Sequence, residues 1–237
     1  MIDLSSEPIQ ALLWSAALWL GLPVLLSLLA SGPQSSVEPD AHEQRAINLG
    51  FWLWEAMALG PILWLLAPYA MDTSLARPTS CLPLDALAFC LALWLGDGIA
   101  TARHRLEHSR MFWAWHAWHH TVDACDWLQT HRHHPISRLL AFAGEVVLLA
   151  HVLGALFGTT PWASLLAAMA CRRAYAIWLH SGSNWGMDTW LARYFVLPGH
   201  HRAHHAGAPI FSGMFRHWDL LWPKPQSRVR EQRVPLR

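Results

Sequence analysis

Apolar runs alternate with polar segments along the chain, and five of them stand out, at residues 11–30, 47–70, 83–102, 139–157 and 161–180. Each approaches the length of about 20 residues that an α-helix needs to cross the hydrocarbon core of a bilayer. The last two are joined by a short turn near Gly158 and Pro161, which predicts a helical hairpin. The pattern predicts an all-α fold, a polytopic membrane bundle of about four or five transmembrane helices with a histidine-rich helical cap.

Ionisable side chains interrupt several of these runs, although such groups are costly to expose to lipid. Glu55 lies in the second run, and Asp97 lies near the end of the third. Arg172 and Arg173 lie inside the fifth run. That helix therefore either leaves the bilayer early or turns both arginines toward a polar cavity.

Composition and charge favour a membrane location. Of the 237 residues, 54% are hydrophobic and 14% are charged, whereas soluble domains have about 25% charged residues. Residues 1–102 contain two basic and nine acidic residues, and residues 103–237 contain fifteen basic and seven acidic ones. By the positive-inside rule, we expect the second half to lie mainly on the cytoplasmic side and the N-terminus outside. No basic block accompanies a groove-reading element, so nucleic-acid binding is not expected.

Histidine is the unusual part of the composition, with 16 residues. Two H-x-x-H-H motifs and one H-x-x-x-H pair supply eight of them: His116, His119, His120, His201, His204, His205, His104 and His108. Positions i, i+3 and i+4 share one face of an α-helix, so the imidazoles of each motif are expected to point the same way. Imidazole suits iron, zinc, copper and nickel, so each motif is a candidate metal-binding face.

The number of histidines favours two metal ions over one. His180, which ends the fifth run, is a ninth candidate ligand. A structural zinc takes about four ligands, so nine histidines suit two ions of higher coordination with positions left open. The simpler alternative is a solvated polar helix face that binds no metal. We expect His131 and His133 to be solvated and His151 to pack between helices.

The histidine motifs belong to a longer ordered series: Asp97, His104-Arg105-x-x-His108, Trp115-His116-x-x-His119-His120, Arg132-x-His134-Pro135, His180-Ser-Gly, Pro198-x-His200-His201-Arg202-x-His204-His205 and Trp218-Asp219-x-Leu221. This order resembles the fatty acid hydroxylase/sterol desaturase superfamily of integral membrane di-iron oxygenases, over residues 90–225. Where many members have an Asn/Tyr-Gly element and a Phe-Gly-Thr ending, this chain has other residues, at 208–213 and 221–223. The substrate therefore stays open.

The resemblance implies a set of metal ligands, namely His104, His108, His116, His119, His120, His180, His201, His204 and His205. Asn184 stands where some members have a further histidine, and it would ligate through oxygen, bind a water or end the helix. His134 matches a His-Pro position and serves either as a ligand or, as we favour, as a hydrogen-bond partner behind the ligands. Asp97 either accepts a hydrogen bond from a ligand imidazole or is only a polar residue at a helix end.

The implied activity is oxygen-dependent hydroxylation of a lipid or another hydrophobic substrate, with two iron ions as cofactor and O2 as co-substrate. Desaturation by the same site is one alternative, and a non-enzymatic membrane metal-binding or transport protein, or a silent scaffold, is another. Electrons are expected from a separate cytochrome b5-like or ferredoxin-like protein, and no oligomeric state is predicted. The expected regions are an N-terminal transmembrane region (1–82), a catalytic domain (83–225) and a basic tail (226–237).

Overall fold

The computed structural model describes residues 41–71, 82–121, 127–181 and 188–222. The first predicted run, the basic tail and Asn184 lie outside these residues. Four long helices and five short ones form the described part of the chain, and it contains no β-strand. They are α3 (Ala41–Met71), α4 (Leu82–Glu107), α5 (Trp113–His116), η2 (Trp127–His131), α6 (Pro135–Phe157), α7 (Trp162–Leu179), η3 (Trp190–Arg193), α8 (Pro198–His205) and α9 (His217–Leu221).

The hairpin predicted from the last two apolar runs is confirmed as α6 and α7. Pro135 stands in the first turn of α6, where its missing N–H costs no helical hydrogen bond. Gly158 ends α6 with a φ of 79°, a left-handed conformation that glycine adopts without strain. Thr160 then donates a hydrogen bond from Oγ1 to the carbonyl oxygen of Ala150 (3.1 Å), which holds the turn against α6.

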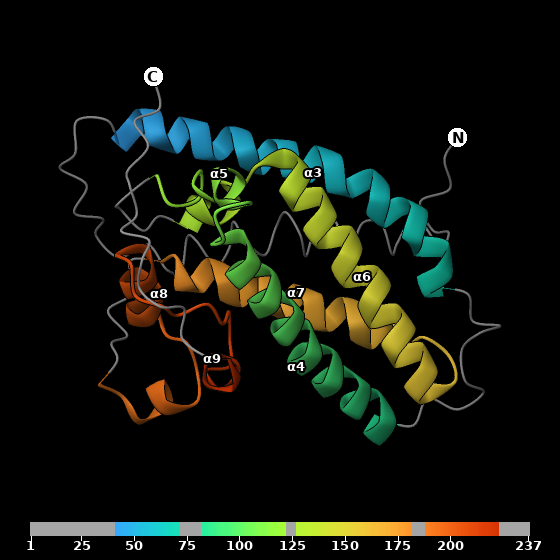
Figure 1. Ribbon diagram of the computed structural model, residues 1–237. Coiled ribbons are helices and arrows are strands. Elements are labelled where there is room, and N and C mark those ends of the chain that lie inside the picture. The colour runs from blue at the N-terminus through green and yellow to red at the C-terminus, as the bar shows by residue number, and fades with distance from the viewer. Residues whose placement is uncertain (1–40, 72–81, 122–126, 182–187, 223–237) are drawn as a thin grey trace.

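Helices α4, α6 and α7 pack together around one apolar core. Its buried members are Ala92, Phe142, Val146, Leu149, Leu153, Leu165, Ala168 and Met169. The three helices run side by side, and the α6–α7 turn lies at the end opposite α5 and α8 (Figure 1). The C-terminal end of α4 and that of α7 therefore lie together with α5 and α8, which carry the histidine motifs.

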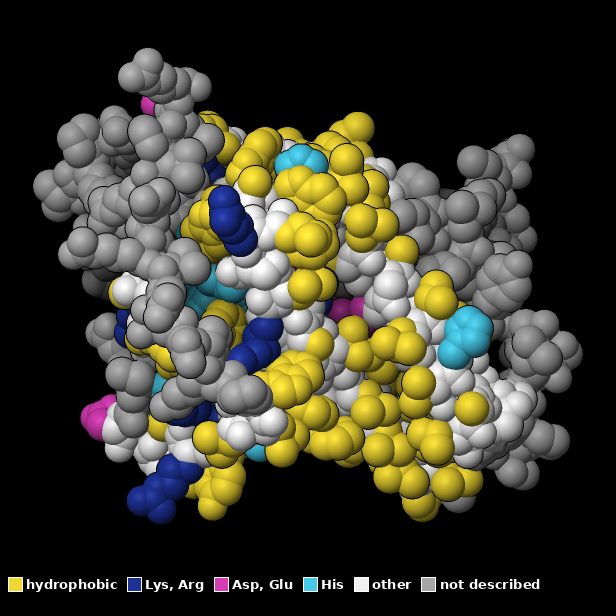
Figure 2. Space-filling view, viewed as in Figure 1, with side chains coloured by type: hydrophobic (Ala, Val, Ile, Leu, Met, Phe, Trp, Pro, Cys, Tyr) yellow, Lys and Arg dark blue, Asp and Glu magenta, His cyan; other side chains and the backbone are white. Residues whose placement is uncertain are grey.

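Two helices of the described residues, α4 and α6, are long and apolar enough to cross a membrane. Their outer faces expose large hydrophobic side chains, among them Leu87, Trp94, Leu140 and Val147. Hydrophobic side chains cover much of the face that these helices form in Figure 2. The prediction of an all-helical fold is thus confirmed for the residues that the structure describes, and the two apolar helices support a membrane location, while four or five crossings stay a prediction.

Glu55, Arg172 and Arg173 of the apolar runs face the protein interior. Arg173 of α7 bonds to both carboxylate oxygens of Glu55, and Arg172 forms an ion pair with Glu145 of α6. Both arginines line a cavity of about 160 Å³. Of the two alternatives for α7, the structure has the polar cavity, and pairing with acids removes most of the cost of burying these charges.

Candidate metal centre

All nine predicted ligands converge at one end of the helix bundle, where they form two groups. The five-histidine group comprises His104, His108, His116, His120 and His204. The four-histidine group comprises His119, His180, His201 and His205. In each group one nitrogen from every ring lies within 4.8 Å of all the others, so each group could hold a metal ion.

Each H-x-x-H-H motif divides its histidines between the two groups. His116 and His120 join the five-histidine group, whereas His119 between them joins the four-histidine group. The second motif does the reverse, with His201 and His205 in the four-histidine group and His204 in the five-histidine group. The imidazoles of each motif thus reach the same metal centre, but each motif contributes to both groups. In α8, residues i and i+4 lie about 40° apart around the helix axis and join one group, whereas residue i+3 lies about 100° from residue i+4 and joins the other.

Short elements place these side chains. Helix α8 starts with Pro198 at its first turn, and the backbone N–H of Leu197 donates to Nδ1 of His200 (3.1 Å). His200 points away from the ligand face and its Nε2 lies 2.5 Å from Arg216. Helix α5 ends at His116, and the following residues continue in tight turns, with His119 N–H donating to the His116 carbonyl (2.9 Å).

The spacing of the Nε2 atoms matches the edges of a coordination shell. In the five-histidine group, Nε2 of His116 lies 3.1 Å from Nε2 of both His104 and His120. In the four-histidine group, Nε2 of His180 lies 3.1 Å from that of His119 and 2.8 Å from that of His201. Metal–imidazole bonds of about 2.0–2.1 Å place adjacent ligands of an octahedron about 2.9 Å apart and those of a tetrahedron about 3.3 Å apart.

Hydrogen bonding between the rings cannot satisfy this arrangement. A neutral imidazole offers one N–H or one lone pair at each nitrogen, so one Nε2 forms one such bond. Nε2 of His116 and Nε2 of His180 each have two Nε2 neighbours. Among the described residues, the buried Nε2 atoms of His108 and His204 have no hydrogen-bond partner. A cation bound in each group would accept the Nε2 lone pairs of that group.

Backbone carbonyl groups orient three of the rings. Nδ1 lies 2.8 Å from Phe211 O in His104, 3.2 Å from Gln129 O in His119 and 2.8 Å from Ala176 O in His180. A carbonyl oxygen only accepts, so each Nδ1 donates its hydrogen. The Nε2 lone pair of each ring is then directed into its group, as metal ligation requires.

Burial also keeps these histidines neutral. Loss of solvation, added to the charge of neighbouring imidazoles, lowers the pKa of His108 to about 2, and burial lowers that of His205 to about 4. For the same reasons the pKa of His119, His201 and His204 lies well below its usual range. Neutral imidazole is the form that binds metal, so the site is poised for a cation at neutral pH.

Two buried side chains behind the ligands were missed in the sequence. Oε2 of Glu107 lies 3.3 Å from Nδ1 of His116, and its Oε1 accepts a hydrogen bond from Ser137 Oγ (2.8 Å). Gln129 is fully buried and donates from Nε2 to the backbone carbonyl of His119 (2.9 Å). Glu107 directly precedes His108, which was an available signal, whereas nothing in the sequence marked Gln129.

The predicted supporting residues lie elsewhere. Asp97 accepts a hydrogen bond at Oδ2 from the backbone N–H of Phe215 (2.8 Å), and among the described contacts none joins it to a ligand imidazole. The His134 ring precedes α6 and stacks on Trp115, with centroids 5.4 Å apart. It belongs to neither histidine group.

Three other histidines differ from expectation. His131 is buried, and its Nδ1 lies 2.9 Å from Glu55 Oε2 and 2.6 Å from Arg173 Nη2. His133 is half-buried and stacks on the His119 ring, with centroids 4.6 Å apart. The prediction that both are solvated is therefore wrong. His151 is exposed on α6 and bonds only within its own helix, to Val147 O, so the predicted packing role is also wrong.

The surroundings of the site are polar on one side and aromatic on another. A cavity of about 160 Å³ touches both groups, through His104, His116, His119, His180 and His201. Charged residues supply much of its remaining wall, among them Arg103, Glu107, Arg138, Glu145, Arg172 and Arg173. The Trp113 ring lies 5.4 Å from that of His108, and the Phe211 ring, which also lines the cavity, lies 5.1 Å from it.

The fold and the site define a class: an all-helical membrane protein with two adjoining histidine groups, each able to hold a metal ion. Residues 89–222, more than half of the chain, match the fatty acid hydroxylase family. The chain belongs to this family, which confirms the superfamily predicted from the order of its motifs. Family and site together support a membrane oxidoreductase of the hydroxylase or desaturase type. No curated protein and no solved structure matches the chain.

Proposed function

We propose that the protein is a non-haem di-iron, oxygen-dependent hydroxylase of a lipid or another hydrophobic substrate. The observation that carries the proposal is the partition of nine neutral histidines into two adjoining groups of five and four. Each group has enough nitrogen ligands for one ion, and neither has the thiolates that favour a structural zinc site. The ligands of this proposal are the nine histidines named above.

Bound iron would supply the reduction of dioxygen and the oxidation of a C–H bond, by the balance R–H + O2 + 2 e⁻ + 2 H⁺ → R–OH + H2O. The chain supplies the ligand geometry, since carbonyl groups fix the His104, His119 and His180 rings. The burial of five of the nine rings, His116, His119, His180, His201 and His204, limits the access of water.

The aromatic side of the site suits the hydrophobic part of a substrate. Trp113 packs against His108 and His120, with ring centroids 5.4 Å and 5.5 Å apart. Phe211 packs against His204, at 5.7 Å. A hydrocarbon segment placed beside these rings would lie next to the five-histidine group. The two electrons would come from a separate cytochrome b5-like or ferredoxin-like partner at the cytoplasmic face, where the proposal places the metal site.

Metal analysis of purified protein tests the first half of the proposal. Protein produced with sufficient iron should contain about two irons per chain, one for each histidine group. His119→Ala and His204→Ala should each lose iron, because each removes a nitrogen from one group. The matched control is His151→Ala, which removes an exposed histidine outside both groups and should keep full loading. Wild-type protein without any bound transition metal contradicts the proposal.

Analysis of membrane lipids tests the second half. Expression of the wild-type protein should produce lipids heavier by one oxygen atom, and the same cells with His119→Ala or His204→Ala should not. A loss of two hydrogens without added oxygen would identify a desaturase instead. Metal binding without any oxygen consumption would favour a transport, sensor or scaffold role.

A further inference from the structure

Helix α3 precedes the part of the chain that matches the family, yet it places an acid in the protein interior. Glu55 is 4% exposed. Its carboxylate has three partners from three different elements: Arg138 of α6, Arg173 of α7 and His131 of η2. A buried carboxylate is costly unless its partners compensate for the lost water, and these contacts do so.

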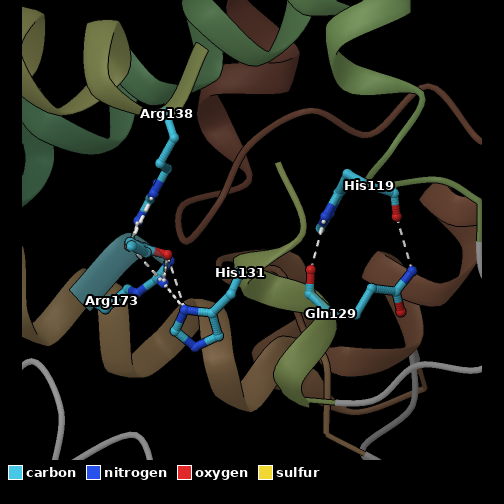
Figure 3. A network of polar contacts seen from close by, with 6 residues as sticks. His119, Gln129, His131, Arg138 and Arg173 are labelled. Carbon is cyan, nitrogen blue, oxygen red and sulfur yellow. Dashed lines mark hydrogen bonds and ion pairs between the residues drawn. The ribbon is translucent and has the colours of Figure 1, made fainter. Parts of the chain in front are cut away.

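The contacts of Glu55 are short and numerous. Oε1 accepts hydrogen bonds from Nε (3.0 Å) and Nη2 (2.7 Å) of Arg138. Nη2 of Arg173 donates to both oxygens, at 2.9 and 2.7 Å. Oε2 also lies 2.9 Å from Nδ1 of His131. Figure 3 shows Arg138, Arg173 and His131 directed toward one point.

The short helix η2, which carries His131, also contacts the candidate metal ligand His119. Gln129, two residues earlier in η2, accepts at its carbonyl oxygen from Nδ1 of His119 (3.2 Å). Its side-chain Nε2 donates back to the His119 carbonyl (2.9 Å). Gln129 therefore fixes both the ring and the backbone of His119 (Figure 3), so any movement of η2 moves this ligand.

A second contact holds η2 against α3. Nη1 of Arg132, the residue after η2, donates to Oε1 of Gln44 (2.7 Å) and lies 3.3 Å from Oδ1 of Asn48. Asn48 and Glu55 lie about two helical turns apart, on one face of α3. Through this face α3 contacts both His131 and Arg132. The Glu55 contacts and the Arg132 contacts thus act on the same segment.

Glu55 also balances charge beside the four-histidine group. Arg138 and Arg173 line the cavity that touches both groups, and the charge of Arg173 acts on His180 of the four-histidine group. Without Glu55, two guanidinium groups would face this cavity with one acid fewer, and added positive charge opposes the binding of a cation. Position and charge therefore act in the same direction.

We propose that Glu55 is a positioning residue for the four-histidine group, acting through η2 on His119. The proposal rests on the proposed function only in requiring that this group binds a metal ion. It extends the metal centre beyond the matched residues 89–222 and assigns α3 a role in it. The five-histidine group, which has no contact with η2 among the described hydrogen bonds, serves as an internal reference.

Titration of the metal-free, full-length protein with Co²⁺ tests this role, because visible absorption of Co²⁺ responds to ligand geometry. His201→Ala and His108→Ala assign the two binding steps to the four- and five-histidine groups. Glu55→Gln should weaken the four-histidine step by about 10–100-fold, as loss of an outer-shell partner typically does. The absorption bands of that step should shift, and the five-histidine step should keep its affinity, which shows that the variant is folded.

Two further variants separate positioning from general loss of stability. Thr160→Ala removes a hydrogen bond that holds the α6–α7 turn, away from η2 and from the cavity, and it should leave both Co²⁺ steps unchanged. Gln129→Ala removes the side-chain bond to His119 and should weaken the same step as Glu55→Gln. Because both act through η2, the double variant should lose less than the product of the two single effects.

The possible outcomes distinguish this proposal from the proposed function. Two intact Co²⁺ steps in Glu55→Gln would overturn the positioning role and leave the metal centre standing. Equal weakening of both steps, shared by Thr160→Ala, would also overturn it, since the effect would then be global. If the wild-type protein binds no Co²⁺ at either group, the metal centre itself is refuted.

Discussion

The burial of His131 predicts a specific loss of stability in acid. Loss of solvation, together with the charge of Arg173, lowers the pKa of His131 to about 4, against about 6.5 in an unfolded chain. The folded protein therefore binds fewer protons than the unfolded chain between these two values. Stability contributed by neutral His131 is fully present above pH 6.5 and is lost as the pH falls toward 4.

The size of the loss follows from the two pKa values. Between pH 7.5 and pH 5, the unfolded histidine becomes almost fully protonated, while the folded one stays mostly neutral. Linkage then gives a loss of about 2 kcal/mol in the free energy of unfolding over this interval. His131→Asn removes the titrating ring and keeps a side-chain N–H near Glu55, so its pH dependence should be shallower by that amount.

The assay is the free energy of unfolding of detergent-solubilised, metal-free protein at pH 7.5 and pH 5, for wild type and variant. Metal-free protein is needed because bound metal would add its own proton competition. His151→Asn is the control, since this histidine is exposed and its loss should leave the pH dependence unchanged. An equal pH dependence in wild type and His131→Asn would show that His131 is not held neutral and would refute the reasoning.

Three further predictions concern packing, ligand selection and metal removal. Gly98→Ala should lower the free energy of unfolding by about 1–3 kcal/mol, because a Cβ there would lie 2.7 Å from the Trp218 ring; a melting temperature equal to wild type would contradict this. His200→Ala should keep the metal content of wild type, since His200 bonds Leu197 and Arg216 and faces neither group, and a lost iron would contradict that placement. Removing metal with a chelator should lower the melting temperature, and adding metal again should restore it. If free metal was at 1,000 times its Kd before removal, the lost stabilisation is about 4 kcal/mol.

Local sequence patterns were sufficient for the elements and for the inventory of the site. Four of the apolar runs correspond to α3, α4, α6 and α7. The length of each run and the helix-ending residues Gly158 and Pro161 are local features, so they can be read from the sequence. The nine histidines also come together as a set, since spacings of three and four residues keep them on one side of a short helix.

The tertiary structure decided how those histidines are shared and what stands behind them. A spacing rule does not say which of two neighbouring centres a ring will face, so His119 and His204 cross to the other motif's group. The supporting partners are far away in sequence: Glu55 is 76 residues from His131 and 118 from Arg173. The polarity of His131 suggested that this side chain is exposed to solvent. It is buried instead, because an acid from α3 and an arginine from α7 pack against it. Composition and spacing are local properties of the chain, whereas burial and partner choice depend on how distant helices pack.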